Sequence, residues 1–161
     1  MGEVTGTYDV AALLARVAEL EGEVAVLSCD NAHSVHPNHP EYADKNHAPV
    51  IGGGIVIKFN AAQSYASDGV SAALFKLICA EAGAKYQYYV NRPDIPGGGT
   101  LGNISNAQVS LDTVDIGLPQ LAMHSSYETA GREDTAELIK ALRVFFGKGL
   151  VADGLGGYKF R

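Results

Sequence analysis

The segment Asp30-Asn-Ala-His33-Ser-Val-His36-Pro-Asn-His39 places one carboxylate and three imidazoles within ten residues. It directly follows an apolar run from Val24 to Leu27, which is typical of a strand buried on both faces, as in a parallel sheet. Aspartate and histidine are common zinc ligands, and histidine titrates near neutral pH. Because open α/β sheets bind ligands where strands end, Asp30 is a candidate site residue; the plainer interpretation is that it caps the following turn.

Apolar patterns downstream of this segment predict alternating strands and helices. Strands are expected at 24–28, 54–60, 86–90 and 113–116, and helices at 10–20, 68–82 and about 100–109. A last helix is expected to be capped by Asp134 and Glu137, with a core face of Leu138, Leu142, Phe145 and Phe146. The core face expected for helix 68–82 comprises Val70, Ala73, Leu74, Leu77 and Ile78. The alternation predicts an α/β sandwich in one domain, with a loose glycine-rich tail over 148–161.

The composition excludes some functions. A net charge of −6 and the lack of a lysine and arginine cluster argue against nucleic acid. No apolar run is long enough to cross a bilayer, and the N-terminus does not resemble a signal peptide, so a soluble cytoplasmic protein is expected. Cys29 and Cys79 lie in apolar segments and are expected to be buried thiols.

Three other patterns have competing interpretations. Pro37 and Pro40 prevent a helix that would gather the loop histidines, so a zinc site made from this loop alone is weakly supported. The run from Gly97 to Gly102 matches Gly-x-Gly-x-x-Gly, but no strand precedes it, which favours a ligand-facing turn over a dinucleotide site. Lys58 interrupts an apolar strand, either as a solvent-exposed edge lysine or as a cation directed at a carboxylate.

An ordered set of segments resembles the aspartyl aminopeptidase family of dinuclear zinc exopeptidases, M18. The matching pieces are Ser28-Cys-Asp-Asn-Ala-His-Ser-Val-His-Pro-Asn38, Asn46-His-Ala-Pro49, Val56-Ile-Lys-Phe-Asn60, Tyr65-Ala-Ser67, Asn91-Arg-Pro-Asp94, Gly98-Gly-Thr-Leu-Gly102 and Leu121-Ala-Met-His-Ser125. They run from about residue 24 to 147 in the family's order. The resemblance implies a three-layer αβα sandwich of the zinc exopeptidase type, of which residues 1–147 are the C-terminal part of the catalytic domain.

The resemblance also implies roles for individual residues. Asp30 and His124 match metal ligands, one for each of two zinc ions, and His33 and Lys58 match residues that favour aspartate or glutamate at the substrate's N-terminus. Tyr65 matches a tyrosine near the substrate, and Gly99 and Thr100 belong to a turn that lines the same cleft. The implied activity is hydrolysis of N-terminal acidic residues from peptides by metal-activated water, in a homo-oligomer that is a dodecamer in the family.

The chain departs from the family in what it lacks. The family's other ligands, a histidine, a bridging aspartate and a Glu-Glu pair that includes the general base, lie upstream of the matching region, and the pair would fall just before Met1. No catalytic base is therefore expected within this chain, and a separate N-terminal segment is an expected partner. The alternatives are an inactive remnant that folds and self-associates, and a mononuclear metal-binding module using Asp30 with loop histidines.

Overall fold

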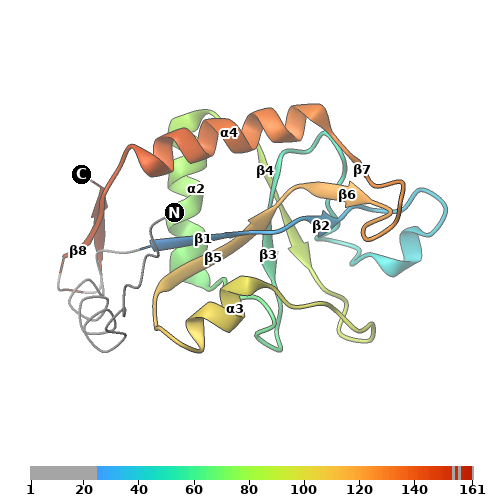
Figure 1. The fold of residues 1–161 in the computed structure, drawn as a ribbon, viewed down its shortest axis with the longest axis horizontal. Helices are drawn as coiled ribbons and strands as arrows, with labels where there is room; N and C mark the ends of the chain where they lie inside the picture. The colour runs from blue at the N-terminus through green and yellow to red at the C-terminus, as the bar shows by residue number, and fades with distance from the viewer. Residues whose placement is uncertain (1–24, 154, 156, 161) are drawn as a thin grey trace, which may run out of the picture.

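The computed structural model describes residues 25–153, 155 and 157–160. The helix predicted for residues 10–20 lies outside this range. The main sheet contains β1 (Ala25–Cys29), β3 (Ile55–Phe59), β4 (Tyr86–Val90) and β5 (Asp112–Gly117), in the order β1-β5-β3-β4 (Figure 1). β1 runs parallel to β5 and β3 parallel to β4, but β3 and β5 are antiparallel. The sheet is therefore mixed, whereas the apolar run before Asp30 suggested a parallel one.

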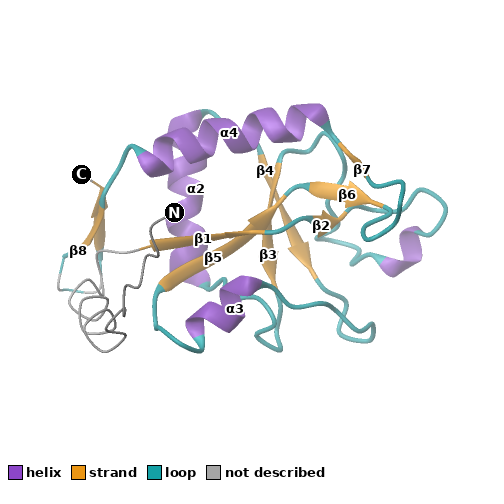
Figure 2. Cartoon of the chain, in the orientation of Figure 1, coloured by secondary structure: helices purple, strands orange, loops and turns teal. Residues whose placement is uncertain are grey.

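Helices cover both faces of this sheet. α2 (Gly69–Ala82) and α4 (Arg132–Phe146) pack on one face, and the short α3 (Leu101–Asn106) lies on the other (Figure 2). Side chains alternate between the faces, so Ile57 and Ile116 enter the core with α2, while Ser28 and Asp115 meet α3. These three layers confirm the predicted α/β sandwich.

A smaller sheet continues the main one beyond Asp30. It contains β2 (Ala32–His33), β6 (Pro119–Leu121) and β7 (Thr129–Ala130), with β2 parallel to β6. Backbone bonds from Asp30 N to Ile116 O (3.0 Å) and from Ala32 N to Leu118 O (2.9 Å) bridge the break between the two sheets. The polar stretch after Asn31, expected to be one long loop, thus begins with a strand and also carries a 3₁₀ turn at Pro40–Tyr42.

The two long helices bury faces other than those expected. α2 begins with a capping box between Asp68 and Ser71 and ends at Gly83, whose φ is 60°. Its buried residues are Ser71, Ala72, Phe75, Ile78 and Cys79. Val70 and Leu77, which were placed in the core, are 46% and 58% exposed. The helix is apolar around most of its circumference, so the spacing of apolar residues does not define its inner face.

The N-cap of α4 is Gly131, so the expectation that Asp134 and Glu137 cap this helix is wrong. The carboxylate of Asp134 is fully buried and accepts bonds from Gly52 N and Gly54 N, both 2.8 Å, just before β3. Glu137 accepts from Lys85 N (2.8 Å). Phe146, predicted to be in the core, is 79% exposed at the end of the helix. Both acidic side chains therefore fasten neighbouring segments to α4.

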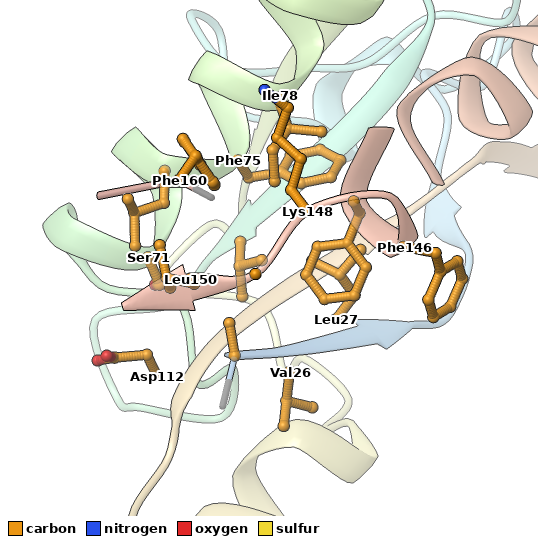
Figure 3. A pocket seen from close by; sticks show the side chains of 15 residues that line it. Val26, Leu27, Ser71, Phe75, Ile78, Asp112, Phe146, Lys148, Leu150 and Phe160 are labelled. Atoms are coloured by element: carbon orange, nitrogen blue, oxygen red, sulfur yellow. The ribbon is translucent and has the colours of Figure 1, made fainter. Parts of the chain in front are cut away.

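The segment after Gly147, expected to be loose, contains a hairpin of β8 (Leu150–Ala152) and β9 (Tyr158–Phe160). Tyr158 Oη bonds to the carboxylate of Asp112, and Lys148 forms a 2.8 Å ion pair with Glu81. With α2 and β1, the hairpin borders an apolar groove of about 240 Å³ (Figure 3). Among the described residues, no helix has the length and apolar content that a membrane crossing requires.

Candidate functional site

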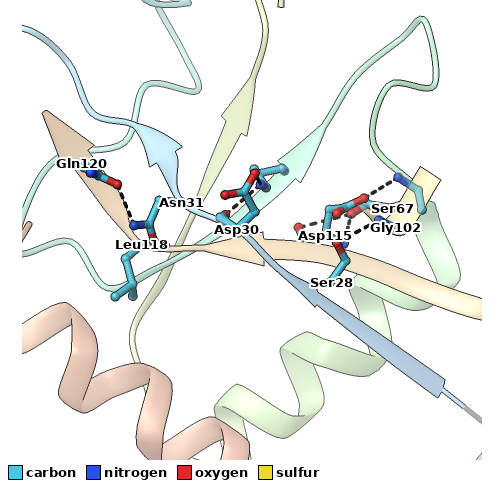
Figure 4. A network of polar contacts seen from close by, with 10 residues as sticks. Ser28, Asp30, Asn31, Ser67, Gly102, Asp115, Leu118 and Gln120 are labelled. Atoms are coloured by element: carbon cyan, nitrogen blue, oxygen red, sulfur yellow. Dashed lines mark hydrogen bonds and ion pairs between the residues drawn. The ribbon is translucent and has the colours of Figure 1, made fainter. Parts of the chain in front are cut away.

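Asp30 lies at the break between the two sheets, as its position after an apolar strand predicted. Its backbone N–H bonds to β5, while its carboxylate is 61% exposed. The next side chain, Asn31, fixes the break from the other side, because its amide donates to Gln120 Oε1 (2.6 Å) and accepts from Leu118 N (3.3 Å) (Figure 4). The strand end is thus held by amides, and the carboxylate of Asp30 projects toward solvent.

Lys58 is fully buried at 1% exposure, and β3 lies between β5 and β4, so the interpretation as an edge lysine is wrong. Its ammonium donates to the main-chain oxygen of Asp30 at 2.8 Å, while Oδ2 of the Asp30 carboxylate is 4.0 Å away. Burial lowers the pKa of Lys58, and the charges of Asp30 and Asp115 oppose this shift. A cation is therefore buried directly beneath the candidate metal ligand.

Tyr65 packs against this cation. Lys58 Nζ lies 5.1 Å from the centre of the Tyr65 ring, which is a cation–π distance. The ring of Tyr89, on β4, lies 6.2 Å from that of Tyr65 on the other side. Burial, with a smaller effect of Tyr89, raises the pKa of Tyr65 to about 12, so its hydroxyl remains protonated at neutral pH. Lys58, Tyr65 and Tyr89 form one cluster, in which Tyr89 was not predicted.

Asp115 is a second buried charge that was not predicted. It is fully buried on β5, opposite Ser28 of β1, and its Oδ2 accepts from Ala66 N at 2.6 Å. Gly102 N donates to Ser28 Oγ (3.0 Å), and a Cβ at Gly102 would lie 2.7 Å from Asp115 Oδ2. The carboxylate therefore joins the segment after Tyr65 to the start of α3. An aspartate inside the apolar strand at 113–116 is the same kind of signal that singled out Lys58.

The expected cleft residues divide between two hollows. Asp30, Gly99 and Thr100 line one of about 550 Å³, together with Cys29 and α3. His33 lines the other, of about 290 Å³, with three more histidines (His36, His39 and His47), Tyr89, Asn91 and Gly98. Thr100 is buried, and its hydroxyl and Asp115 Oδ1 find no partner among the described residues. His33 and Asp30 thus line different hollows, and the glycine run contributes Gly98 to one and Gly99 to the other.

Cys29 is exposed, so the expectation of two buried thiols holds only for Cys79. Cys29 is the last residue of β1, and it lines the same hollow as Asp30 and Thr100.

His124 lies in a turn after β6, and its φ of 67° is in the left-handed region, as is the 54° of Ala122. Such backbone is strained for residues other than glycine and is found at functional sites. β6 pairs with β2, which begins two residues after Asp30, so Asp30 precedes one strand of this pair and His124 follows the other. Across the described part of the chain, however, no three histidine, cysteine, aspartate or glutamate side chains are grouped for one metal ion. Catalytic zinc takes three protein ligands, so these residues alone do not complete a zinc site.

Comparisons with known proteins fit this arrangement. The family described as Aminopeptidase I zinc metalloprotease (M18) matches residues 10–146. The chain is 46% identical over 121 residues to "Probable M18 family aminopeptidase 2" of Pseudomonas paraeruginosa, a match that covers 75% of this chain and 28% of that protein. The protein of the same name from Stutzerimonas stutzeri is 45% identical over the same shares.

Solved structures give the same picture. The chain resembles a chain of the complex between Ape4 and Nbr1 with a TM-score of 0.77 and 32% identity, covering 86% of this chain and 28% of that one. It resembles the mApe1 dodecamer of S. cerevesiae with a TM-score of 0.72 and 28% identity, covering 86% of this chain and 33% of that one. The chain thus spans about 28% of the length of the curated relatives cited above. With a family match over most of its length and the same fold in solved relatives, the chain belongs to the M18 family of zinc metalloproteases.

Proposed function

We propose that this chain forms the substrate-facing part of a zinc aminopeptidase that removes N-terminal aspartate or glutamate from peptides. The observation that carries the proposal is the ammonium of Lys58, which is buried at a strand end beneath Asp30. Among the described residues, its only oxygen neighbour at hydrogen-bond distance is a neutral main-chain carbonyl, so no carboxylate of this part of the chain is hydrogen-bonded to the ammonium. In low-dielectric surroundings this charge attracts a substrate carboxylate and disfavours an apolar side chain.

The other expected residues have roles that suit this substrate. His33 is exposed in its hollow and can present a ring N–H to an acidic side chain. Gly99 and Thr100 border the hollow that holds Asp30, where a peptide's N-terminal residue would lie. Tyr65 keeps its proton far above neutral pH, so its hydroxyl is a donor for a developing oxyanion.

Asp30 and His124 would each supply one ligand to one of two zinc ions, which activate water and polarise the scissile carbonyl when bound. The remaining ligands and the general base would come from another polypeptide segment, since the described residues hold no group of three ligands. We also propose assembly as a homo-oligomer, in keeping with the dodecamer that one structural relative forms.

A non-catalytic, self-associating module is the alternative function. It is favoured by the position of β1 at the edge of the sheet formed by the described strands, because an edge that has no partner among them invites association. Leu101 and Ile104 on α3 are 74% and 60% exposed, which adds apolar surface near that edge.

Reconstitution separates the two functions. The purified chain is mixed with the separately expressed N-terminal part of the Pseudomonas paraeruginosa relative, and zinc content is measured together with release of a chromophore from Glu-, Asp- and Leu-linked substrates. The proposal expects two zinc ions per complex and turnover of the acidic substrates, neither of which the separate parts give. A mixture that binds no zinc and cleaves nothing, while the chain associates with itself, would establish the alternative.

A further inference from the structure

We propose that Asn91 is a positioning residue, which holds Tyr65, through Tyr89, in a fixed relation to the glycine turn Gly97–Gly99. The inference deepens the proposed function and rests on it, because Tyr65 and this turn are parts of the same site. It assigns a role to two residues, Tyr89 and Asn91, that the sequence did not single out for chemistry.

The side chain of Asn91 makes three hydrogen bonds. Its Nδ2 donates to Ile95 O at 2.9 Å and to Arg92 O at 3.0 Å, and its Oδ1 accepts from Tyr89 Oη at 2.9 Å. Both N–H donors of the amide are thereby used, and its oxygen accepts one bond. A residue bonded in three directions has one rotamer available, so whatever rests on it is fixed with it.

The glycine turn rests directly on this amide. A Cβ built on Gly97 would lie 2.8 Å from Asn91 Cγ and Nδ2, closer than any real side chain approaches. The main chain at Gly97 therefore packs flat against the amide, and glycine is required there by space. Two residues further on, Gly99 lies against the main-chain oxygen of Ser64, where a Cβ would be 3.7 Å away. The turn thus spans the distance between Asn91 and the residue before Tyr65.

Tyr89 makes the second connection. It is the register partner of Lys58 in the parallel pair of β3 and β4, so both side chains leave the same face of the sheet. Its ring packs 6.2 Å from that of Tyr65, and its hydroxyl donates to Asn91. Burial raises the pKa of Tyr89, so this donor persists through the neutral range. The contacts run from Lys58 to Tyr65, Tyr89, Asn91 and the glycine turn without a gap.

A purely structural asparagine would need fewer of these contacts. The bonds to Arg92 O and Ile95 O are enough to close the loop after β4. The bond from Tyr89 adds nothing to that loop, but it joins the loop to the tyrosine pair. Tyr89→Phe removes the bond to Asn91 together with the interaction of the same hydroxyl with Tyr65, while it keeps the ring and both loop bonds. It therefore separates the closing of the loop from the connection between the loop and the tyrosine pair.

The test uses the intact chain, Tyr89→Phe, and Tyr86→Phe as a matched control on the same strand, whose side chain packs near Tyr88 away from the site. Amide signals of Gly97, Gly98 and Gly99 are followed by NMR. The ionised fraction of Tyr65 is measured at pH 11 by ultraviolet difference against Tyr65→Phe. With a pKa of about 12, roughly a tenth of Tyr65 is ionised at that pH.

We expect Tyr89→Phe to move all three glycine signals and to raise the ionised fraction of Tyr65 several-fold, whereas Tyr86→Phe changes neither. In the reconstituted enzyme, kcat/KM should fall about tenfold with most of the loss in kcat, because orientation rather than binding is impaired. Unchanged glycine signals and unchanged Tyr65 ionisation in Tyr89→Phe would overturn the inference. These readouts need no activity, so a failed reconstitution would count against the proposed function and leave the positioning role decided by NMR.

Discussion

Lys58 donates from Nζ to the main-chain oxygen of Asp30 at 2.8 Å, while the carboxylate of the same residue stays 4.0 Å away and 61% exposed. The ammonium therefore fixes the backbone at the end of β1, and its ion pair with the carboxylate is long rather than hydrogen-bonded. The carboxylate of Asp30 thus belongs to a residue whose backbone is fixed, but the carboxylate itself is not in a tight ion pair. This suits a metal ligand, because a tight ion pair would have to be broken before a metal could bind.

Replacing Lys58 by methionine should leave the fold intact and remove the selectivity. The apolar side chain avoids the desolvation cost of a buried ammonium, but it leaves Asp30 O without its donor and the buried Asp115 without the charge of Lys58, so the free energy of unfolding should fall by about 1–3 kcal/mol. In the reconstituted enzyme, kcat/KM for a Glu-linked substrate should fall about 100-fold while a Leu-linked substrate is affected little. Lys45→Met, at an exposed loop position, is the control. A loss of more than about 3 kcal/mol in urea unfolding would make Lys58 a structural residue instead.

The carboxylate of Asp134 should contribute strongly to stability, because it accepts from Gly52 N and Gly54 N in full burial. Asp134→Asn replaces one acceptor by an N–H group that faces another donor, at an expected cost of about 2–4 kcal/mol in urea unfolding. Glu133→Gln, an exposed neighbour at the start of the same helix, should change the free energy of unfolding by less than about 0.5 kcal/mol. Equal effects of the two substitutions would contradict the bonds to the glycines.

Gly102 should be intolerant of any side chain. Its added Cβ would lie 2.7 Å from Asp115 Oδ2 and 2.9 Å from Ser28 Cβ, both buried. Gly102→Ala should therefore lower the free energy of unfolding by about 1–3 kcal/mol, through overpacking between α3 and the sheet. Gly98→Ala meets nothing within 4 Å and should be neutral or slightly stabilising. Chemical unfolding of both variants decides the point, and a harmless Gly102→Ala would show that α3 can shift away from β5.

Titration of the Cys79 thiol should lower the free energy of unfolding at alkaline pH. Burial raises the pKa of its thiol from 9.0 to about 12, so the folded chain keeps this proton after the unfolded chain has begun to lose it. The contribution is fully present below pH 9 and is lost as the pH rises toward 12. Cys79→Ala, which leaves a small cavity, should be less stable than the parent by about 1–2 kcal/mol at pH 7. That gap should narrow as urea unfolding is repeated from pH 9 to 11, and a constant gap would mean that the thiol titrates equally in both states.

Much of the fold followed from the sequence because its signals are local. Capping residues Asp68 and Gly83 bound α2, and apolar runs bounded β1, β3 and β5 within a residue or two. The sequence patterns did not predict how the elements are oriented in the fold. The inner face of α2 depends on which of two apolar stripes meets the sheet, and the direction of β5 depends on a crossover that no local pattern encodes.

The same division applies to the candidate site. Asp30 was identified from its place after an apolar strand, and burial of Lys58 agrees with the sharper of its two interpretations. Asp115, Tyr89 and Asn91 were missed, because their importance lies in contacts with residues far along the chain: Ala66, Tyr65 and the glycine turn. The separation of His33 and Asp30 into two hollows also depends on how the glycine turn folds between them.

The two bonds that Asp134 accepts have a consequence for how this family can vary in length. Surface loops ordinarily gain and lose residues between relatives with little effect. Here Gly52 and Gly54, with one residue between them, must both reach the same carboxylate, and β3 with Lys58 begins directly after them. An insertion or deletion between Pro49 and Ile55 would release one of these amides and move Lys58 along its strand. Relatives that keep an aspartate at this point of α4 should therefore show a constant number of residues in this loop, even where neighbouring loops differ in length.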